Sequence, residues 1–140
     1  MNGEKVLFDT NVLVHAYDSL SAKHAAASKA LEQAFADRSG AVSVQNLAEF
    51  SHVAVFRAER RLSPGEVRKT VFELSSILEV VSYDAYAISD ALSIWEKYGL
   101  HFFDALLAAT MEKEGISAII TENEKDFQKI PWLEVINPFK

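Results

Sequence analysis

The chain has 140 residues, of which 49% are apolar and 24% are charged, with a formal net charge of −6. This length and composition are typical of one globular domain, expected over residues 1–140, and they exclude a disordered chain. The sequence contains no cysteine, which excludes disulfides and thiolate zinc sites.

The sequence lacks an apolar run of membrane-spanning length, and its N-terminus lacks the basic flank and apolar stretch of a signal peptide. We therefore expect a cytoplasmic protein without a membrane partner. The negative charge disfavours non-specific nucleic-acid binding. However, five basic residues stand against two acidic ones between Arg57 and Lys69. They could hold a phosphate backbone or simply solvate helix surfaces.

In chain order, short apolar runs alternate with segments of helical periodicity. The first run, Val6–Phe8, ends at Asp9 and predicts a buried strand. Residues 22–36 are rich in alanine and predict a helix, residues 41–44 predict a second strand, and apolar residues at helical spacing follow from Leu47.

The middle of the chain contains a clear helix start. Ser63 stands at the N-cap, Pro64 at the first helical position and Glu66 three residues after the cap, which is the pattern of a capping box. A short strand is expected within residues 78–81.

A further helix is bracketed by Asp84 as its N-cap and Gly99 as its end. Its apolar residues at helical spacing are Ile88, Leu92 and Trp95. We expect both tryptophans and the phenylalanines to fill the core rather than to stack on bases.

The last third predicts an almost entirely apolar helix over residues 101–114, ended by Gly115, and strands at 117–120 and 133–136. Alternating strands and helices indicate an α/β fold with a parallel sheet and helices on both faces. In such sheets, ligands bind at the carboxyl ends of the strands, where the strand order reverses.

Four carboxylates stand near ends of predicted strands or starts of predicted helices: Asp9, Glu49, Asp104 and Asp126. If the fold brings them together, they form an acidic pocket that a hard cation such as Mg²⁺ would neutralise.

Each acid also has a purely structural interpretation. Asp9 or Asn11 could cap the following helix, and Glu49 could lie at the edge of an apolar stripe. Asp104 could be an N-cap, although its apolar neighbours predict burial and therefore a need for compensation. Asp126 could be a turn residue.

The segments FDTNVLVHAYD, HFFDALLAAT, ITENEKDF and VINPF, in this order, resemble the PIN-domain ribonucleases, and most closely the VapC-type toxins of type II toxin–antitoxin pairs. The resemblance spans almost the whole chain. It implies a three-layer α/β/α sandwich around a central, mainly parallel sheet. It also implies that the four carboxylates bind one or two Mg²⁺ or Mn²⁺ ions.

Residue roles follow from this resemblance and from metal chemistry. Asp9 and Asp104 are expected to bind the metal directly, and Glu49 to bind it or to orient the attacking water. Asp126 would act at a second site or through water. Asn11, Thr121 and Asn123 are expected to support these ligands. Thr121 and Asn123 fit the family pattern, so whether Asn123 or Asp126 completes the site stays open.

The expected activity is metal-dependent endoribonucleolytic hydrolysis of RNA. The resemblance further implies a homodimer and an antitoxin partner that blocks the acidic pocket, for instance with a basic side chain. Two alternatives stay open: a non-catalytic PIN-like module that binds RNA or protein, and another Mg²⁺-dependent phosphoesterase or DNA nuclease. An aspartyl-phosphatase is disfavoured because position 11 is asparagine rather than aspartate.

Overall fold

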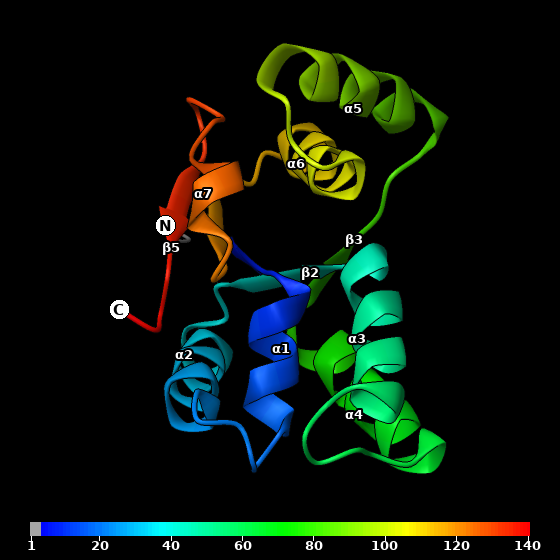
Figure 1. Ribbon diagram of the computed structural model, residues 1–140, viewed down its shortest axis with the longest axis vertical. Helices are drawn as coiled ribbons and strands as arrows, with labels where there is room; N and C mark the ends of the chain where they lie inside the picture. The colour runs from blue at the N-terminus through cyan, green and yellow to red at the C-terminus, as the bar shows by residue number, and fades with distance from the viewer. Residues whose placement is uncertain (1–3) are drawn as a thin grey trace.

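The computed structural model describes residues 4–140; residues 1–3, which belong to the expected domain and to the N-terminus read for a signal peptide, lie outside the described residues. Within residues 4–140, five strands form one sheet and seven helices flank it (Figure 1). The strands are β1 (Val6–Phe8), β2 (Gly40–Ser43), β3 (Glu79–Val81), β4 (Ala118–Ile120) and β5 (Glu134–Ile136). The helices are α1 (Thr10–Tyr17), α2 (His24–Asp37), α3 (Val44–Phe56), α4 (Pro64–Ile77), α5 (Ala85–Tyr98), α6 (Phe102–Glu114) and α7 (Glu124–Phe127).

The sheet has the strand order β3-β2-β1-β4-β5, and every neighbouring pair is parallel. The chain builds outward from β1 to β3 and then returns to place β4 beside β1. The strand order therefore reverses between β1 and β4, and the carboxyl ends of these two strands flank the switch point. The predicted α/β class and parallel sheet are confirmed.

Helices cover both faces of the sheet, as the predicted three-layer sandwich requires (Figure 1). Successive side chains of a strand point to opposite faces. Accordingly, Leu7 packs in the cluster with α5 and α6, whereas Phe8 packs in the cluster with α1 to α4. Ala41 and Val42 divide between the same two clusters. Two separate hydrophobic cores therefore pack against the two faces of the sheet.

Helix α6 lies between the sheet and α5 and is buried around most of its circumference (Figure 1). Seven consecutive residues from Ala105 to Met111 are buried. Gly115 follows in the left-handed conformation, with φ of 72°, and ends the helix as predicted. This burial holds the start of α6, and with it Asp104, in a defined place beside the sheet.

The capping box of α4 is present in both halves. Ser63 Oγ accepts a hydrogen bond from the Glu66 amide at 3.1 Å, and Glu66 Oε1 accepts one from the Ser63 amide at 2.9 Å. This prediction is confirmed because the motif depends on four consecutive residues and needs no tertiary partner.

The apolar face predicted for α5 is not its buried face. Ile88, Leu92 and Trp95 are 40%, 48% and 49% exposed. The residues buried against α6 are Ala87, Ala91 and Ile94. Small side chains let the two helices approach closely, so the larger residues stay on the solvent side. The expectation that Trp95 fills the core is therefore wrong.

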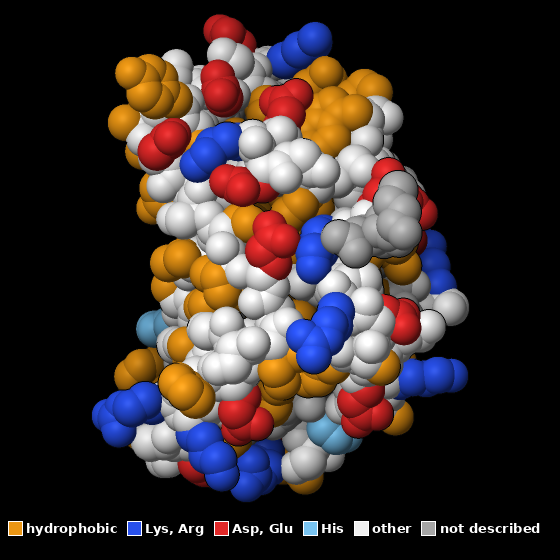
Figure 2. Space-filling model, turned by 180° about the vertical axis from the view of Figure 1, so that it is seen from behind, with side chains coloured by type: hydrophobic (Ala, Val, Ile, Leu, Met, Phe, Trp, Pro, Cys, Tyr) orange, Lys and Arg blue, Asp and Glu red, His pale blue; other side chains and the backbone are white. Residues whose placement is uncertain are grey.

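The same expectation is wrong for three phenylalanines, which lie on the surface. These are Phe56, Phe72 and Phe103, exposed by 60%, 72% and 51%. In Figure 2, apolar side chains gather at the end of the molecule where α5 lies in Figure 1.

Val44 and Asp126 also lie in other elements than predicted. Val44 begins α3 instead of ending β2, because Ser43 forms a capping box with Asn46. Asp126 lies in the short helix α7 rather than in a turn. Within residues 4–140, none of the helices combines the length and the apolar character needed to cross a membrane.

Candidate functional site

A pocket of about 720 Å³ opens at the switch point of the sheet. Three of the four predicted acids line it: Asp9 from the end of β1, Glu49 from α3 and Asp104 from α6. The other lining residues are Thr10, Asn11, Val14, His15, Ala48, His52, Val53, Glu122 and Asn123. Side chains from four separate parts of the chain therefore meet in one concave site.

Asp9 both caps α1 and faces the pocket. Its Oδ1 accepts a hydrogen bond from the Thr10 amide at 2.8 Å, and its Oδ2 accepts from Thr121 Oγ1 at 2.8 Å and from Asn11 Nδ2 at 3.3 Å. The capping interpretation is thus correct without excluding a role in the pocket. Burial raises the pKa of Asp9, and the charge of Glu49 adds to this effect, although the three hydrogen bonds act in the opposite direction.

Asp104 lies in the first turn of α6, whose N-cap is His101, so an N-cap role for Asp104 is wrong. Burial and the nearby charge of Asp9 raise the pKa of Asp104 to about 6, with smaller contributions from Asp126 and Glu49. The charge of His101 opposes this rise. The Asp104 carboxyl group therefore lies among other negatively charged groups, and a bound cation would offset their repulsion.

Two hydrogen bonds in series connect Glu49 to Asn46 through Thr10. Thr10 Oγ1 donates to Glu49 Oε1 at 2.9 Å and accepts from Asn46 Nδ2 at 3.1 Å. Asn46 is fully buried and is itself fixed by the capping box with Ser43. Thr10 and Asn46 were not predicted as site residues, because their connection to Glu49 joins two helices that are distant in sequence.

Thr121 joins the end of β4 to the end of β1. Its fully buried hydroxyl donates to Asp9 and accepts from the Asn123 amide at 2.9 Å, with Asn11 Nδ2 at 3.5 Å. Thr121 therefore orients one oxygen of Asp9 across the switch point. Thr121 was predicted to support the metal ligands, and its hydrogen bond to Asp9 is the contact through which it would do so.

Asn123 lies between two of the predicted acids. Its Nδ2 donates to Asp104 Oδ2 at 3.1 Å and to Asp126 Oδ2 at 3.3 Å. Asn123 lines the pocket, whereas Asp126 does not and forms an ion pair with Lys129 at 3.4 Å. Asp126 is thus connected to Asp104 through Asn123.

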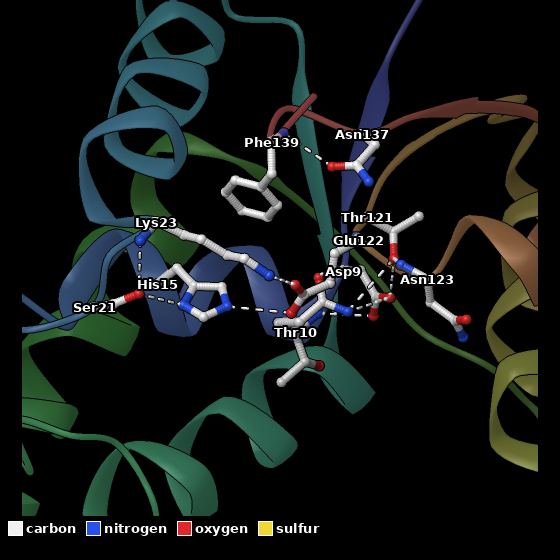
Figure 3. A network of polar contacts seen from close by, with 11 residues as sticks. Asp9, Thr10, His15, Ser21, Lys23, Thr121, Glu122, Asn123, Asn137 and Phe139 are labelled. Atoms are coloured by element: carbon white, nitrogen blue, oxygen red, sulfur yellow. Dashed lines mark hydrogen bonds and ion pairs between the residues drawn. The ribbon is translucent and has the colours of Figure 1, made fainter.

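Three titratable residues that line the pocket were not among the predicted site residues: His15, His52 and Glu122. The Glu122 carboxylate contacts His15 Nε2 at 3.2 Å and forms an ion pair with Lys23 (Figure 3). Burial raises the pKa of Glu122, but the hydrogen bonds and charges of Lys23 and His15 outweigh it, so the pKa is lowered overall. No local motif marks these contacts, which join positions about a hundred residues apart.

The basic segment between Arg57 and Lys69 spans the end of α3 and the start of α4. All five basic side chains are exposed. Asp18 holds the connection by accepting from the Glu59 and Arg60 amides at 2.8 and 2.9 Å. Figure 2 shows basic side chains gathered at the end of the molecule where α3 and α4 meet. These residues do not line the acidic pocket.

The donor set fits a hard divalent cation, because the pocket offers carboxylate and amide oxygens and raises the pKa values of Asp9 and Asp104. Within residues 4–140, no three acidic or histidine side chains are arranged as a ready-made cage. Mg²⁺ commonly takes one or two protein carboxylates and completes its shell with water and substrate oxygens. The residues present fit that mode of binding.

Comparison with known proteins agrees with this geometry. The family model of the PIN domain matches residues 6–133. Ribonuclease VapC1 of Aquifex aeolicus (strain VF5) is 24% identical over 138 residues, which cover 97% of this chain and 92% of the relative. A toxin–antitoxin complex from Klebsiella pneumoniae is similar in structure, with a TM-score of 0.71 and 24% identity, covering 97% of this chain and 99% of that chain. The sarcin–ricin loop cleaving toxin VapC20 of Mycobacterium tuberculosis gives a TM-score of 0.69 at 17% identity, over 89% of this chain and 94% of that chain.

Proposed function

Because this chain belongs to the PIN-domain family, we propose that it is a metal-dependent endoribonuclease that hydrolyses RNA phosphodiester bonds. The observation that carries the proposal is the convergence of Asp9, Glu49 and Asp104 on one pocket at the switch point of a parallel sheet. The Aquifex relative is a ribonuclease, and the Mycobacterium relative is a toxin that cleaves the sarcin–ricin loop. Both relatives support RNA as the substrate.

The roles of the four acids would depend on their positions in the site. When bound, one or two Mg²⁺ or Mn²⁺ ions would neutralise the carboxylates and stabilise negative charge on the phosphate oxygens. Asp9 and Asp104 would hold the ion. Glu49 is exposed and free to accept a hydrogen bond from the attacking water, while its other oxygen is oriented by Thr10. Asp126 would contribute through Asn123 or through water.

We also propose that the protein is the toxin of a toxin–antitoxin pair and meets RNA and its antitoxin in the cytoplasm. The structural relative from Klebsiella is such a complex. The acidic pocket would attract a basic side chain of an antitoxin in place of the metal ion. The lining of the same pocket includes Val14, Ala48 and Val53, which suits apolar side chains next to that basic side chain.

We also propose that the protein forms a homodimer. The exposed apolar face of α5, formed by Ile88, Leu92 and Trp95, is a surface that a second copy would bury. It lies on the side of α5 away from α6, so dimerisation would not disturb the packing that fixes Asp104.

The experiment that tests the activity compares RNA with DNA of the same sequence. Purified protein, freed from any antitoxin, is incubated with single-stranded RNA, the matched DNA and total RNA, each with Mg²⁺, Mn²⁺ or EDTA. We expect RNA cleavage with either metal, none in EDTA, and intact DNA. Cleavage of DNA alone would favour a DNA nuclease. RNA binding without cleavage of any RNA, by a folded protein that binds Mn²⁺, would favour a non-catalytic module.

A further inference from the structure

Two basic side chains converge at the rim of the acidic pocket. His15 projects from α1, and Lys23 lies immediately before α2; both reach the carboxylate of Glu122 (Figure 3). Each side chain contacts a different oxygen, His15 through Nε2 at Oε1 and Lys23 through Nζ at Oε2. Because His15 and Glu122 line the same pocket as Asp9 and Asp104, this pair adjoins the proposed catalytic site.

The two basic side chains are held independently of Glu122. Lys23 Nζ lies 5.2 Å from the ring centroid of Phe139, and the His15 ring meets the same ring edge to face with centroids 5.5 Å apart. His15 Nδ1 also lies 2.7 Å from Ser21 Oγ. Cation–π and aromatic contacts of this kind restrict side chains that would otherwise be mobile. Both groups would therefore keep their places if the Glu122 carboxylate moved away.

Glu122 is able to move without disturbing the acidic site. Its main chain is fixed separately, since its amide donates to Asn11 Oδ1 at 3.3 Å. Its side chain is 29% exposed, so rotation toward solvent is open to it. The carboxylate presents one oxygen to each of the two basic side chains, as a phosphate group of a nucleic-acid strand would.

An RNA strand that places one phosphate at the acids must place the next phosphate nearby. The wall that carries Asp9, Glu49 and Asp104 repels that phosphate, and the chain as a whole has a net charge of −6. Binding of a polyanion to such a surface requires basic groups beside the acids. Lys23 and His15 supply them at the rim.

We propose that Lys23 and His15 form a subsite for an RNA backbone phosphate next to the one that is cut, and that the Glu122 carboxylate occupies this subsite until RNA displaces it. This inference rests on the proposed ribonuclease function and adds the contact by which the substrate strand is positioned. Glu122 then acts as a competitor, which weakens RNA binding in the free protein.

The test measures RNA binding separately from cleavage. Fluorescence anisotropy of a labelled single-stranded RNA is recorded with Ca²⁺ in place of Mg²⁺, and a gel verifies that the RNA stays intact. The variants are Lys23→Gln and Glu122→Gln. Lys29→Gln is the matched control, because Lys29 lies exposed on α2 and makes none of these contacts. Thermal unfolding of each variant verifies that it is folded.

Lys23→Gln should weaken binding several-fold and lower the slope of log affinity against log salt by about 0.7, as for one lost single-strand phosphate contact. Glu122→Gln should strengthen binding, and Lys29→Gln should behave as wild type. The opposite signs are decisive, because a merely structural ion pair would make both substitutions weaken binding.

Equal behaviour of Lys23→Gln and Lys29→Gln, or weaker binding by Glu122→Gln, would overturn the subsite and leave the ribonuclease proposal intact. A folded wild-type protein that binds no RNA under any of these conditions would overturn both.

Discussion

Asp104 is a half-buried carboxyl group with three acidic neighbours, and its protonation should affect the stability of the metal-free protein. Its pKa of about 6 in the folded protein lies above the ordinary value of 3.8. Between these two values the folded state binds more protons than the unfolded state. The free energy of unfolding should therefore fall as the pH rises from about 4 to about 6, by on the order of 1 to 2 kcal/mol after allowance for solvent screening.

The substitution Asp104→Asn should remove this dependence and raise the melting temperature in EDTA at pH 7.5. Asp90→Asn on the exposed surface of α5 is the control and should leave the wild-type pH profile unchanged. Melting curves between pH 4 and pH 8 measure the effect. An Asp104→Asn profile that overlays the Asp90→Asn profile would contradict the assignment of the raised pKa.

Thr121 orients Asp9 through its hydroxyl, so its removal should act on metal binding as well as on stability. Thr121→Val keeps the shape but leaves a buried carboxylate oxygen without its shortest donor. We expect the free energy of unfolding to fall by about 1 to 3 kcal/mol. We expect the Mn²⁺ affinity to fall by about 10- to 100-fold.

Thr110→Val is the matched control for this experiment. Thr110 is equally buried, but its hydroxyl bonds only the Leu106 carbonyl of its own helix. Calorimetric titration with Mn²⁺ should show wild-type affinity for Thr110→Val. If both variants bind Mn²⁺ equally well, Thr121 does not position a metal ligand.

At the scale of the elements, Gly40 shows how closely β2 packs under its helices. A Cβ atom at this position would lie 2.5 Å from Leu78 Cδ2 and 3.2 Å from Ala34 Cβ, both in buried side chains. Gly40→Ala should therefore lower the free energy of unfolding by about 1 to 3 kcal/mol through overpacking.

Gly65 provides the opposite case. It lies near the start of α4, where an added Cβ would find only Ser63 Oγ within 4 Å, at 3.9 Å. Gly65→Ala should leave stability unchanged or raise it by about 0.5 kcal/mol. Denaturant unfolding of the two variants measures both effects, and a Gly40→Ala protein as stable as Gly65→Ala would refute the packing argument.

Local signals explain which elements could be predicted from sequence. Strand β1 and the capping box at Ser63 depend on neighbouring residues, and both predictions hold. The orientation of α5 depends instead on what packs against it. Ile88 and Leu92 have the spacing of a buried face, but the alanines on the other side fit closer to α6. Sequence periodicity identifies an apolar stripe without showing whether this molecule or a second copy covers it.

The same distinction applies to the site. Asp9 and Asp104 could be placed in advance, because strand ends and helix starts converge at the switch point of a parallel sheet. The contact of Glu122 with His15 and Lys23 could not be predicted, because it depends on side-chain directions across about a hundred residues.

At the scale of the whole molecule, the exposed face of α5 should determine the oligomeric state. Leu92→Glu places a charge in the middle of this face and should convert the proposed dimer to a monomer without unfolding it. Phe72→Glu on α4 is the control, because Phe72 is even more exposed, at 72%, but lies on another surface.

Light scattering after size-exclusion chromatography gives the mass of each species. The expected result is a dimer for the wild type and for Phe72→Glu, and a monomer for Leu92→Glu. A wild-type monomer, or a Leu92→Glu dimer, would show that α5 is not the interface between two copies.

We propose that the pocket built from Asp9, Glu49 and Asp104 cuts RNA with a divalent metal ion. The most direct measurement is the rate of RNA cleavage in Mn²⁺ by the wild type, Asp9→Asn, Asp104→Asn and the surface control Asp90→Asn, all prepared identically. We predict that both pocket variants lose at least about 100-fold in rate, as expected when electrostatic stabilisation is removed, while Asp90→Asn retains it. Cleavage that survives both pocket substitutions would show that RNA is not cut in this pocket.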